Sequence, residues 1–351
     1  MRSNSAMRVQ TFVSQIEAFR KEWLSPDPTL VVSTSGSTGV PKQIRVEKAR
    51  MRASARRTCL VLGIKPGSLS LLCLPVQYIA GRMVCVRAWE CGLRLVAVEP
   101  SLHPLAGLDF VPNFVAMTPA QVFETLRVPN EAEILKRVGV LIIGGGAVGS
   151  DLANMLRDVA GAWCTYGMTE TLSHIALKRV DEELFTPLPE VSLSLDRRGC
   201  LVVTDSVTGV DNLLTNDLAD LRPDGKFRIL GRADNVICSG GLKWQIEDIE
   251  IRLSNLPVPF QITSVPDKRL GCAIVLLYQV APNADSELLR QQIQTECRNV
   301  LPRHAAPRHL IPVGELPLTP TGKPDRSAAR RLAETIIDTS NTSAHVRQSL
   351  L

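Results

Sequence analysis

Four short and nearly all-apolar runs recur between residues 69 and 146, separated by stretches of helical or polar character. Apolar runs of this length are typical of strands buried on both faces, which occur in parallel sheets covered by helices. Because these strands alternate with amphipathic segments, the pattern predicts a large α/β domain with a mostly parallel sheet flanked by helices. The four runs are LSLLCLP, LRLVAV, NFVAMT and VGVLIIGGG.

The pattern changes twice after this alternation. From about residue 191, VSLSL, CLVVT, NLLT and KFRIL predict a short antiparallel segment, because Gly, Asp and Pro separate them. After GRADNVICSGG the strands and helices predict a small α+β domain. We therefore expect an N-terminal domain over residues 1–233, a mobile C-terminal domain over 234–337 and a flexible polar tail over 338–351.

Composition excludes several classes of function. The net charge of +5 is only mildly basic, and the 4% aromatic content argues against nucleic-acid binding. The nine cysteines form no C-x-x-C pair, which favours reduced thiols in the cytoplasm. No apolar stretch reaches the ~20 residues that span a bilayer, so we expect no membrane insertion. The sequence leaves open whether the chain forms a homo-oligomer.

The segment STSGSTGVPK, residues 33–42, combines glycines, hydroxyl groups and a lysine after an apolar run. Backbone N–H groups, hydroxyl donors and a cation together favour a phosphate-binding loop. Val40 and Pro41 separate Gly39 from the lysine, so the segment does not match the P-loop of nucleotide-binding proteins. The alternative is a flexible linker. The candidate ligands are Thr34, Ser35, Gly36, Ser37, Thr38, Gly39 and Lys42.

The run LIIGGGAVGSDL supports two interpretations. Gly144, Gly146 and Gly149 match the G-x-G-x-x-G fingerprint of dinucleotide-binding enzymes, with Glu170 near the place of the ribose-binding acid. This interpretation predicts an NAD(P)-binding oxidoreductase. In the other interpretation, the flat glycine run lets an adenine ring lie against the backbone.

Four further motifs each have an ordinary alternative. Glu170 in TYGMTET suits a magnesium ion bound to phosphate, or a plain turn before a helix. Asp217 in TNDLADL suits ribose hydroxyls, or a turn. Asp234 in GRADNVICSGG suits a hinge, or a linker. Lys323 in LPLTPTGKPDR suits a mobile negative charge, or simple exposure to solvent.

Taken in order, these motifs resemble the core motifs of the adenylate-forming superfamily, which includes acyl-CoA synthetases, luciferases and peptide-synthetase adenylation domains. The resemblance covers residues 28–333 and implies ATP, Mg²⁺ and coenzyme A as cofactor and co-substrates. It implies that the phosphate loop grips the pyrophosphate end of ATP, that Thr169 contacts the α-phosphate and that Glu170 holds magnesium. It further implies that Lys323 is the adenylation lysine and Asp234 the hinge. The remaining nucleotide-binding residues it implies are Gly144, Gly145, Gly146, Ala147, Tyr166, Gly167, Asp217 and Arg232.

Within the superfamily, LPVQYIAGRMVCVRAW and YGMTETLSHIAL are most similar to bacterial o-succinylbenzoate–CoA ligases of menaquinone biosynthesis. This resemblance implies an acid–thiol ligase in which Tyr78, Arg87 and His174 contact the acyl substrate. Arg87 aligns with the arginine that those enzymes use near the aromatic carboxylate. The sequence departs from the family in its short N-terminal part, in Tyr78 where many relatives carry histidine, and in Asn216 where glycine is usual. The alternative substrate is another aromatic or short-chain acid.

Overall fold

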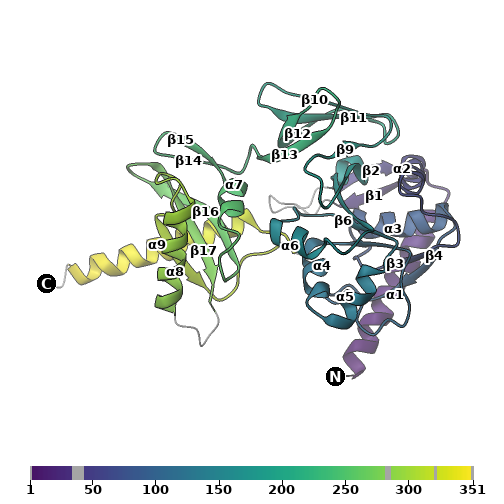
Figure 1. Cartoon of the computed structure of the whole chain (residues 1–351), viewed down its shortest axis with the longest axis horizontal. Coiled ribbons are helices and arrows are strands. Elements are labelled where there is room, and N and C mark those ends of the chain that lie inside the picture. The colour runs from purple at the N-terminus through teal and green to yellow at the C-terminus, as the bar shows by residue number, and fades with distance from the viewer. Residues whose placement is uncertain (1, 34–42, 281–285, 320–321, 349–351) are drawn as a thin grey trace. The chain divides into compact units, whose positions relative to one another are not determined.

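The computed structural model describes residues 2–33, 43–280, 286–319 and 322–348 of the chain. It divides into two compact units (Figure 1). One unit holds the described residues up to Thr215 together with Ala219–Arg228. The other holds Asn216–Leu218 and the described residues from Ile229 onward. The observed division lies a few residues before the expected boundary at residue 234, and the functional assignment of the two domains stays a prediction.

A seven-stranded sheet forms the centre of the first unit, in the order β4-β3-β5-β6-β7-β8-β9. The strands from β4 to β7 pair in parallel, and β8 and β9 are added antiparallel at one edge. This confirms the mostly parallel sheet predicted from the apolar runs. The strands are β3 (Leu69–Leu72), β4 (Arg94–Ala97), β5 (Phe114–Met117), β6 (Val140–Ile143), β7 (Ala162–Gly167), β8 (His174–Arg179) and β9 (Thr186–Pro187).

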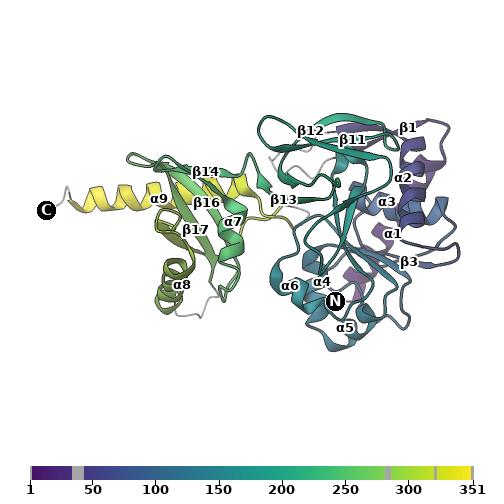
Figure 2. The same cartoon turned by 45° about the horizontal axis from the view of Figure 1, so that its top comes forward.

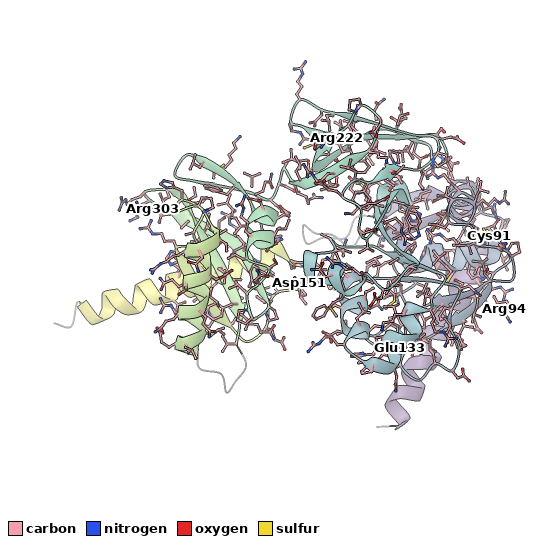
Figure 3. The ribbon with its side chains drawn as sticks, viewed as in Figure 1. Cys91, Arg94, Glu133, Asp151, Arg222 and Arg303 are labelled. Carbon is pink, nitrogen blue, oxygen red and sulfur yellow. The ribbon has the colours of Figure 1, made fainter. Side chains whose placement is uncertain are left out.

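Helices cover both faces of this sheet. On β5, Phe114 and Ala116 pack with one set of helices, whereas Val115 and Met117 pack with the other, because successive strand residues point to opposite faces. Figure 2 shows the helices around this sheet, and Figure 3 adds the side chains of the described residues. The first set is α1 (Arg2–Leu24), α2 (Lys48–Val61) and α3 (Ile79–Glu90); the second is α4 (Pro119–Leu126), α5 (Pro129–Lys136) and α6 (Ser150–Met155).

Local sequence accounts for several helix ends. Thr118 caps α4 in a reciprocal capping box with Gln121, and Pro119 occupies the first helical turn. Gly63 follows α2 with φ +65°, a left-handed conformation that glycine adopts without steric cost. The ammonium of Lys48 is buried and donates to the carbonyls of Glu22 (2.6 Å) and Ser25 (2.9 Å), so it satisfies the C-terminal end of α1.

A separate four-stranded sheet follows in the order β10-β11-β12-β13, and β10 pairs antiparallel with β11. A buried ion pair ties this sheet to α2, since both nitrogens of the Arg57 fork donate to the Asp205 carboxylate at 2.8 and 2.7 Å. The strands are β10 (Val191–Leu195), β11 (Cys200–Asp205), β12 (Val210–Leu221) and β13 (Phe227–Arg232); the short hairpin β1 (Thr29–Ser33) and β2 (Gln43–Glu47) completes the strands before β14.

The second unit is built on a five-stranded sheet in which β15, β14, β17 and β16 are neighbours and β18 pairs with β17. Ile274, Leu276 and Tyr278 of β17 pack with α7 and α8, and Ala273, Val275 and Leu277 pack against α9. The strands are β14 (Val236–Ser239), β15 (Leu242–Gln245), β16 (Phe260–Asp267), β17 (Gly271–Gln279) and β18 (His309–Val313); the helices are α7 (Ile246–Arg252), α8 (Ser286–Val300) and α9 (Arg326–Gln348).

Residues 338–348, which the sequence predicted as part of a polar tail, belong to α9. Their flexibility stays a prediction. Across the described ranges, no helix combines the length and apolar character needed to cross a bilayer.

Candidate active site

Several residues selected from the sequence follow the carboxyl ends of neighbouring parallel strands in the first unit. Gly144–Ala147 come directly after β6, and Thr169 and Glu170 come directly after β7. Because β6 and β7 pair in parallel, both segments leave the sheet at the same edge. This edge is the usual ligand-binding edge of open α/β sheets. The sheet therefore brings the glycine run and the TYGMTET motif together.

The first glycine of the run lies against the next strand too closely for a side chain. A Cβ atom on Gly144 would be 2.6 Å from the hydroxyl oxygen of Thr165, which itself donates to the carbonyl of Ile143 (3.0 Å). Gly145 has φ +86°, a conformation that disfavours any other residue. The run consequently exposes backbone rather than side chains at the strand ends.

Tyr166 belongs to an aromatic cluster beside the strand-end loops. Its ring contacts Phe227 edge-on at 5.3 Å and lies 6.0 Å from Phe185, and those two phenylalanines stack at 5.5 Å. Offset and edge-on ring contacts of this kind fix the ring in one orientation. The cluster provides an apolar, flat-sided wall of the type that a heterocyclic base can stack on.

The turn after β7 is strained and tightly bonded. Leu172 is buried with φ 63°, a conformation that costs of order 1–3 kcal/mol in a non-glycine residue. The Thr171 hydroxyl accepts from the backbone of Met168 (3.0 Å) and donates to the carbonyl of Ser173 (2.7 Å). A side chain on Gly167 would collide with the backbone of Ser173. The turn therefore fixes Thr169 and Glu170, which lie on one 3₁₀ turn, relative to Ser173.

Arg87 is buried inside the first unit, with 2% of its surface exposed. Burial lowers the pKa of its guanidinium to about 10, while the nearby thiols of Cys59 and Cys91 act in the opposite direction. The group therefore remains charged at neutral pH. Its Nη2 donates to the hydroxyl of Ser173 at 2.5 Å, and no described residue forms a hydrogen bond with its buried Nε. No carboxylate among the described residues forms an ion pair with it.

His174 is buried beside Arg87. Its Nδ1 lies 3.3 Å from the Ser173 hydroxyl and its Nε2 lies 3.3 Å from the Thr58 hydroxyl. Burial lowers the pKa of this imidazole well below its usual range, and the positive charges of Arg87 and Arg57 lower it further. The ring is therefore neutral at pH 7. Tyr78, the third expected acyl-binding residue, is partly buried at the N-terminus of α3 and forms a backbone bridge with Ser33.

In the second unit, charged residues of β12, of β13 and of the turn that follows β13 form one ion-pair network. Arg232 donates to Asp217 through Nη1 (3.1 Å) and to Asp234 through Nε (2.8 Å) and Nη2 (2.7 Å). Burial raises the pKa of Asp234, but the Arg232 contacts more than offset this effect and lower it overall. The amide of Asn216 also donates to Asp234 at 3.4 Å. The network brings Asp217, selected from TNDLADL, together with Arg232 and Asp234, which both belong to GRADNVICSGG; their roles toward ribose and as a hinge stay predictions.

Lys323 lies in a tight loop of the second unit. Its backbone N–H donates to the hydroxyl of Thr319 (3.1 Å), and the backbone of Thr319 donates to its carbonyl (2.7 Å). The residue is exposed, yet surrounding protein lowers the pKa of its ammonium, Arg232 lowers it further, and Asp217 opposes the shift. Lys323 therefore shares an electrostatic environment with Asp217 and Arg232.

The remaining expected ligands concern phosphate and metal. The phosphate-loop residues Thr34–Lys42 lie outside the described residues. Within the described ranges no three His, Cys, Asp or Glu side chains converge as a metal cage. A magnesium ion bound to a nucleotide usually needs only one or two carboxylates in addition to phosphate and water. The exposed carboxylate of Glu170, at the ligand-binding edge of the sheet, fits that requirement.

Sequence reasoning missed Ser173 and Thr58, which contact the buried imidazole. Ser173 follows the TYGMTET motif by two residues, and nothing in the sequence around it distinguishes it from an ordinary turn serine. Thr58 lies on a helix rich in arginine, and only the tertiary contact between α2 and β8 reveals its role.

Two family comparisons agree with this geometry. Residues 4–208 match the family of AMP-binding enzymes, and residues 261–323 match the C-terminal domain of AMP-binding enzymes. The first match alone covers more than half of the chain. The chain therefore belongs to the family of AMP-binding enzymes. This confirms the resemblance to the adenylate-forming superfamily, and it does not support the alternative of a dinucleotide-binding oxidoreductase.

Individual relatives narrow the comparison. The chain is 30% identical to a probable 2-succinylbenzoate–CoA ligase of Mycobacterium tuberculosis, over 89% of this chain and 86% of the relative. It is 37% identical to an acyl-CoA synthetase (AMP-forming)/AMP-acid ligase II-like protein from Dyadobacter fermentans, with a TM-score of 0.60 over 91% of this chain and 93% of that one. The o-succinylbenzoate coenzyme A synthetase from Bacillus subtilis, in complex with ATP and magnesium ion, shares the fold with a TM-score of 0.70 at 21% identity, over 85% and 68% of the two chains.

Proposed function

We propose that this protein is an ATP-dependent acid–thiol ligase that activates 2-succinylbenzoate and transfers the acyl group to coenzyme A, a reaction of menaquinone biosynthesis. The name of the Mycobacterium tuberculosis relative supports the substrate. One observation within the chain carries the proposal, namely the buried positive charge of Arg87, with which no carboxylate of the described residues forms an ion pair. Since ATP and coenzyme A are cytoplasmic metabolites, we also place the protein in the cytoplasm.

A buried cation is costly unless an anion pairs with it. 2-Succinylbenzoate has two carboxylates, of which the succinyl carboxylate is activated and the ring carboxylate is not. The ring carboxylate must leave water when it binds, at a cost that a charge-assisted contact to Arg87 would offset. Tyr78 and His174 would line the same acyl site. A dicarboxylic acid therefore fits the charge of this site better than a monocarboxylic acid does.

In the first half-reaction, the succinyl carboxylate attacks the α-phosphorus of ATP and pyrophosphate leaves. No general base is needed, because the carboxylate is already an anion at pH 7. The chain's part is alignment and charge neutralisation. Lys323 would approach the reacting phosphate, Thr169 would contact the α-phosphate, and Asp217 and Arg232 would hold the ribose. Gly144–Ala147, Tyr166 and Gly167 would flank the adenine, and Thr34–Lys42 would grip the departing pyrophosphate.

Glu170 would hold the Mg²⁺ ion, which when bound neutralises part of the phosphate charge. In the second half-reaction, the thiol of coenzyme A attacks the acyl carbon of the adenylate, the acyl–phosphate bond breaks, and AMP leaves. Lys323 would serve only the first step. We propose that rotation about Asp234 lets the second domain adopt a different orientation for each step.

A second candidate is an acyl-CoA ligase for another aromatic or short-chain acid. The Dyadobacter fermentans relative favours this broader function, since its name specifies no acid. The two candidates differ in whether a second carboxylate is required.

The test measures pyrophosphate release with 2-succinylbenzoate and with 4-oxo-4-phenylbutanoate, which lacks the ring carboxylate. We expect Arg87→Met to raise KM for 2-succinylbenzoate by roughly 10- to 1,000-fold, equivalent to ~1.4–4 kcal/mol, and to leave KM for ATP unchanged. The KM for the monocarboxylic acid should not change with the substitution. Arg94→Met is the matched control, because Arg94 is exposed on β4 (Figure 3). A wild-type preference for 4-oxo-4-phenylbutanoate would favour the broader ligase.

A further inference from the structure

A continuous chain of hydrogen bonds runs from Arg87 through the interior of the first unit. Arg87 Nη2 contacts the Ser173 hydroxyl at 2.5 Å, which lies 3.3 Å from His174 Nδ1. On the other side of the ring, Nε2 lies 3.3 Å from the Thr58 hydroxyl, which is 3.0 Å from the carbonyl of Ser54. The chain joins three elements that are distant in sequence, α3, β8 and α2.

The number of available hydrogens determines which group donates and which accepts in each hydrogen bond of this series. Each hydroxyl has one hydrogen to donate and can accept from other donors. Thr58 donates its hydrogen to the Ser54 carbonyl, so it accepts from the N–H at Nε2 of His174. In a neutral ring Nδ1 is then an acceptor, and Ser173 donates to it. The Ser173 oxygen consequently presents its lone pairs to Arg87, which has only hydrogens to offer.

The reverse direction leaves a hydrogen without an acceptor. If Nδ1 carried the hydrogen, the Ser173 oxygen would accept from both His174 and Arg87. Its own hydrogen would then have no partner among the side-chain contacts of Ser173. A buried donor without a partner costs about 1–3 kcal/mol. The direction from Arg87 toward Ser54 therefore gives a partner to both hydroxyl groups and to both ring nitrogens of His174.

We infer that Ser173 is a positioning residue that orients the Arg87 guanidinium, and that the neutral, Nε2-protonated form of His174 and the Thr58 hydroxyl fix Ser173 for this task. This inference rests on the proposed function, because it assigns the remaining guanidinium hydrogens to the ring carboxylate of the substrate. The hydroxyl accepts one guanidinium hydrogen without neutralising the charge. The buried Nε, which has no partner in the described part of the chain, keeps a donor hydrogen.

The surrounding charges favour the same state of the ring. Arg87 on α3 and Arg57 on α2 are the cations near His174, and Asp205 of β11 already pairs with Arg57. A proton on Nδ1 would place a second positive charge next to Arg87. It would also remove the acceptor that orients the Ser173 hydroxyl.

The experiment compares Ser173→Ala and Ser173→Thr with wild type. Loss of a hydrogen bond to a charged group predicts a roughly 10- to 100-fold higher KM for 2-succinylbenzoate in Ser173→Ala, with kcat and KM for ATP within about twofold. Ser173→Thr keeps the hydroxyl and should restore KM. Ser206→Ala is the control, since Ser206 is an exposed hydroxyl that donates to Glu190 at 2.8 Å.

The second measurement is ¹⁵N NMR of the histidine rings of the intact protein at pH 7, with His174 assigned by His174→Gln. We expect His174 to be protonated at Nε2 and unprotonated at Nδ1, and Thr58→Val to disturb this preference. A ring protonated at Nδ1, or at both nitrogens, would overturn the inference. So would an unchanged KM in Ser173→Ala while Arg87→Met raises it, although the proposed function would stand. An unchanged KM in both variants would refute the proposed function itself.

Discussion

His174 shows how strongly burial acts on a single residue of this protein. The imidazole lies beside two arginines in the interior, and burial together with these charges keeps its pKa well below the usual range. In the native state His174 therefore stays unprotonated at pH values, below about 6.5, where the same side chain is protonated in the unfolded chain. Stability must consequently decrease as the pH falls through this value, because the unfolded state binds more protons there.

We predict that wild type loses stability between pH 6.5 and 5 with a His174 contribution of at most ~1.4 kcal/mol per pH unit. His174→Gln should reduce this slope, although it also lowers stability at pH 7 by disturbing the buried chain of hydrogen bonds. Urea unfolding at several pH values measures both effects. His304→Gln, at an exposed position, is the control. Equal slopes in wild type and His174→Gln would show that another group dominates the acid sensitivity.

Lys323 carries a prediction for the chemistry. Lys323→Ala should slow adenylate formation by roughly 10²–10³-fold, because one preorganised charge facing the transition state is lost. Thioester formation from pre-formed acyl-adenylate should remain mostly intact. Pyrophosphate release and thioester production measure the two steps separately.

The control is Lys136→Ala, whose ammonium pairs with the exposed Glu133 on the surface of α5 (Figure 3). Equal losses in both half-reactions would contradict a role for Lys323 in the first step alone.

Among the helices and strands, α9 and α7 are joined by a two-pronged ion pair. Arg326 donates to both oxygens of Glu250 at 2.5 and 2.6 Å, and Glu250 also accepts from the backbone of Ile262 at 3.0 Å. Both side chains are about one-fifth exposed. The pair therefore fixes the start of α9 against the sheet of the second unit.

We predict that Arg326→Met lowers the free energy of unfolding of the second unit by about 1–3 kcal/mol, because Glu250 keeps its charge in a half-buried place. Arg330→Met on the same helix is the matched control. It breaks only an exposed pair with Glu334 four residues away and should cost about 0.3–0.5 kcal/mol. Denaturant unfolding measures both, and similar losses would assign the effect to helix packing instead.

Asp234 is expected to act as a hinge between elements. Asp234→Pro should leave adenylate formation largely intact and strongly reduce thioester production, because proline fixes φ near −65° and restricts rotation. Single-turnover assays of each half-reaction measure the outcome. Normal overall turnover would remove Asp234 as the hinge. A loss of adenylation alone would instead point to the ion pair of Asp234 with Arg232.

The elements differ in how far they could be predicted. The strands β3, β5 and β6 were predictable because their residues are apolar on both faces. Strand β16 was missed, since Thr263 and Ser264 interrupt its apolar pattern, and it is stabilised by pairing with β17 and by the packing of Ile262 and Val265 in the core. The end of α9 was expected to be irregular because its last residues are polar. The helix nevertheless continues through them, because Ala329 and Ala333 pack its first turns into the core.

At the scale of the whole molecule, the two units have separate hydrophobic cores. The clusters on the two faces of the large sheet share no residue with those around β17. Multidomain proteins of this kind commonly depart from two-state unfolding. We predict two unfolding steps, of which Arg326→Met shifts only one. Differential scanning calorimetry measures this, and one transition that moves as a whole would contradict it.

The motifs of the site could be predicted from the sequence, but the contacts between their side chains could not. Its chemistry could be proposed because Lys323, Asp217 and Glu170 occur in motifs that resemble a family. Arg87 has the apolar neighbours Val84, Val86 and Ala88, which are typical of a buried segment but do not indicate which groups Arg87 contacts. The contacts of Ser173 depend on the left-handed backbone conformation of Leu172, and the sequence around a leucine does not predict such a conformation.

The parallel pairing of β6 with β7 has a consequence for how such a protein can change. The glycine run begins where the pairing of β6 ends, whereas TYGMTET begins on β7 itself and leaves the sheet only after Gly167. Loops are also where insertions are tolerated best. Substitution of the loop glycines would be costly, because a Cβ atom on Gly144 or Gly167 would collide with neighbouring atoms and Gly145 has a positive φ, so laboratory evolution would keep the glycines and change the exposed positions beside them. The scaffold and its chemistry are thereby open to separate selection.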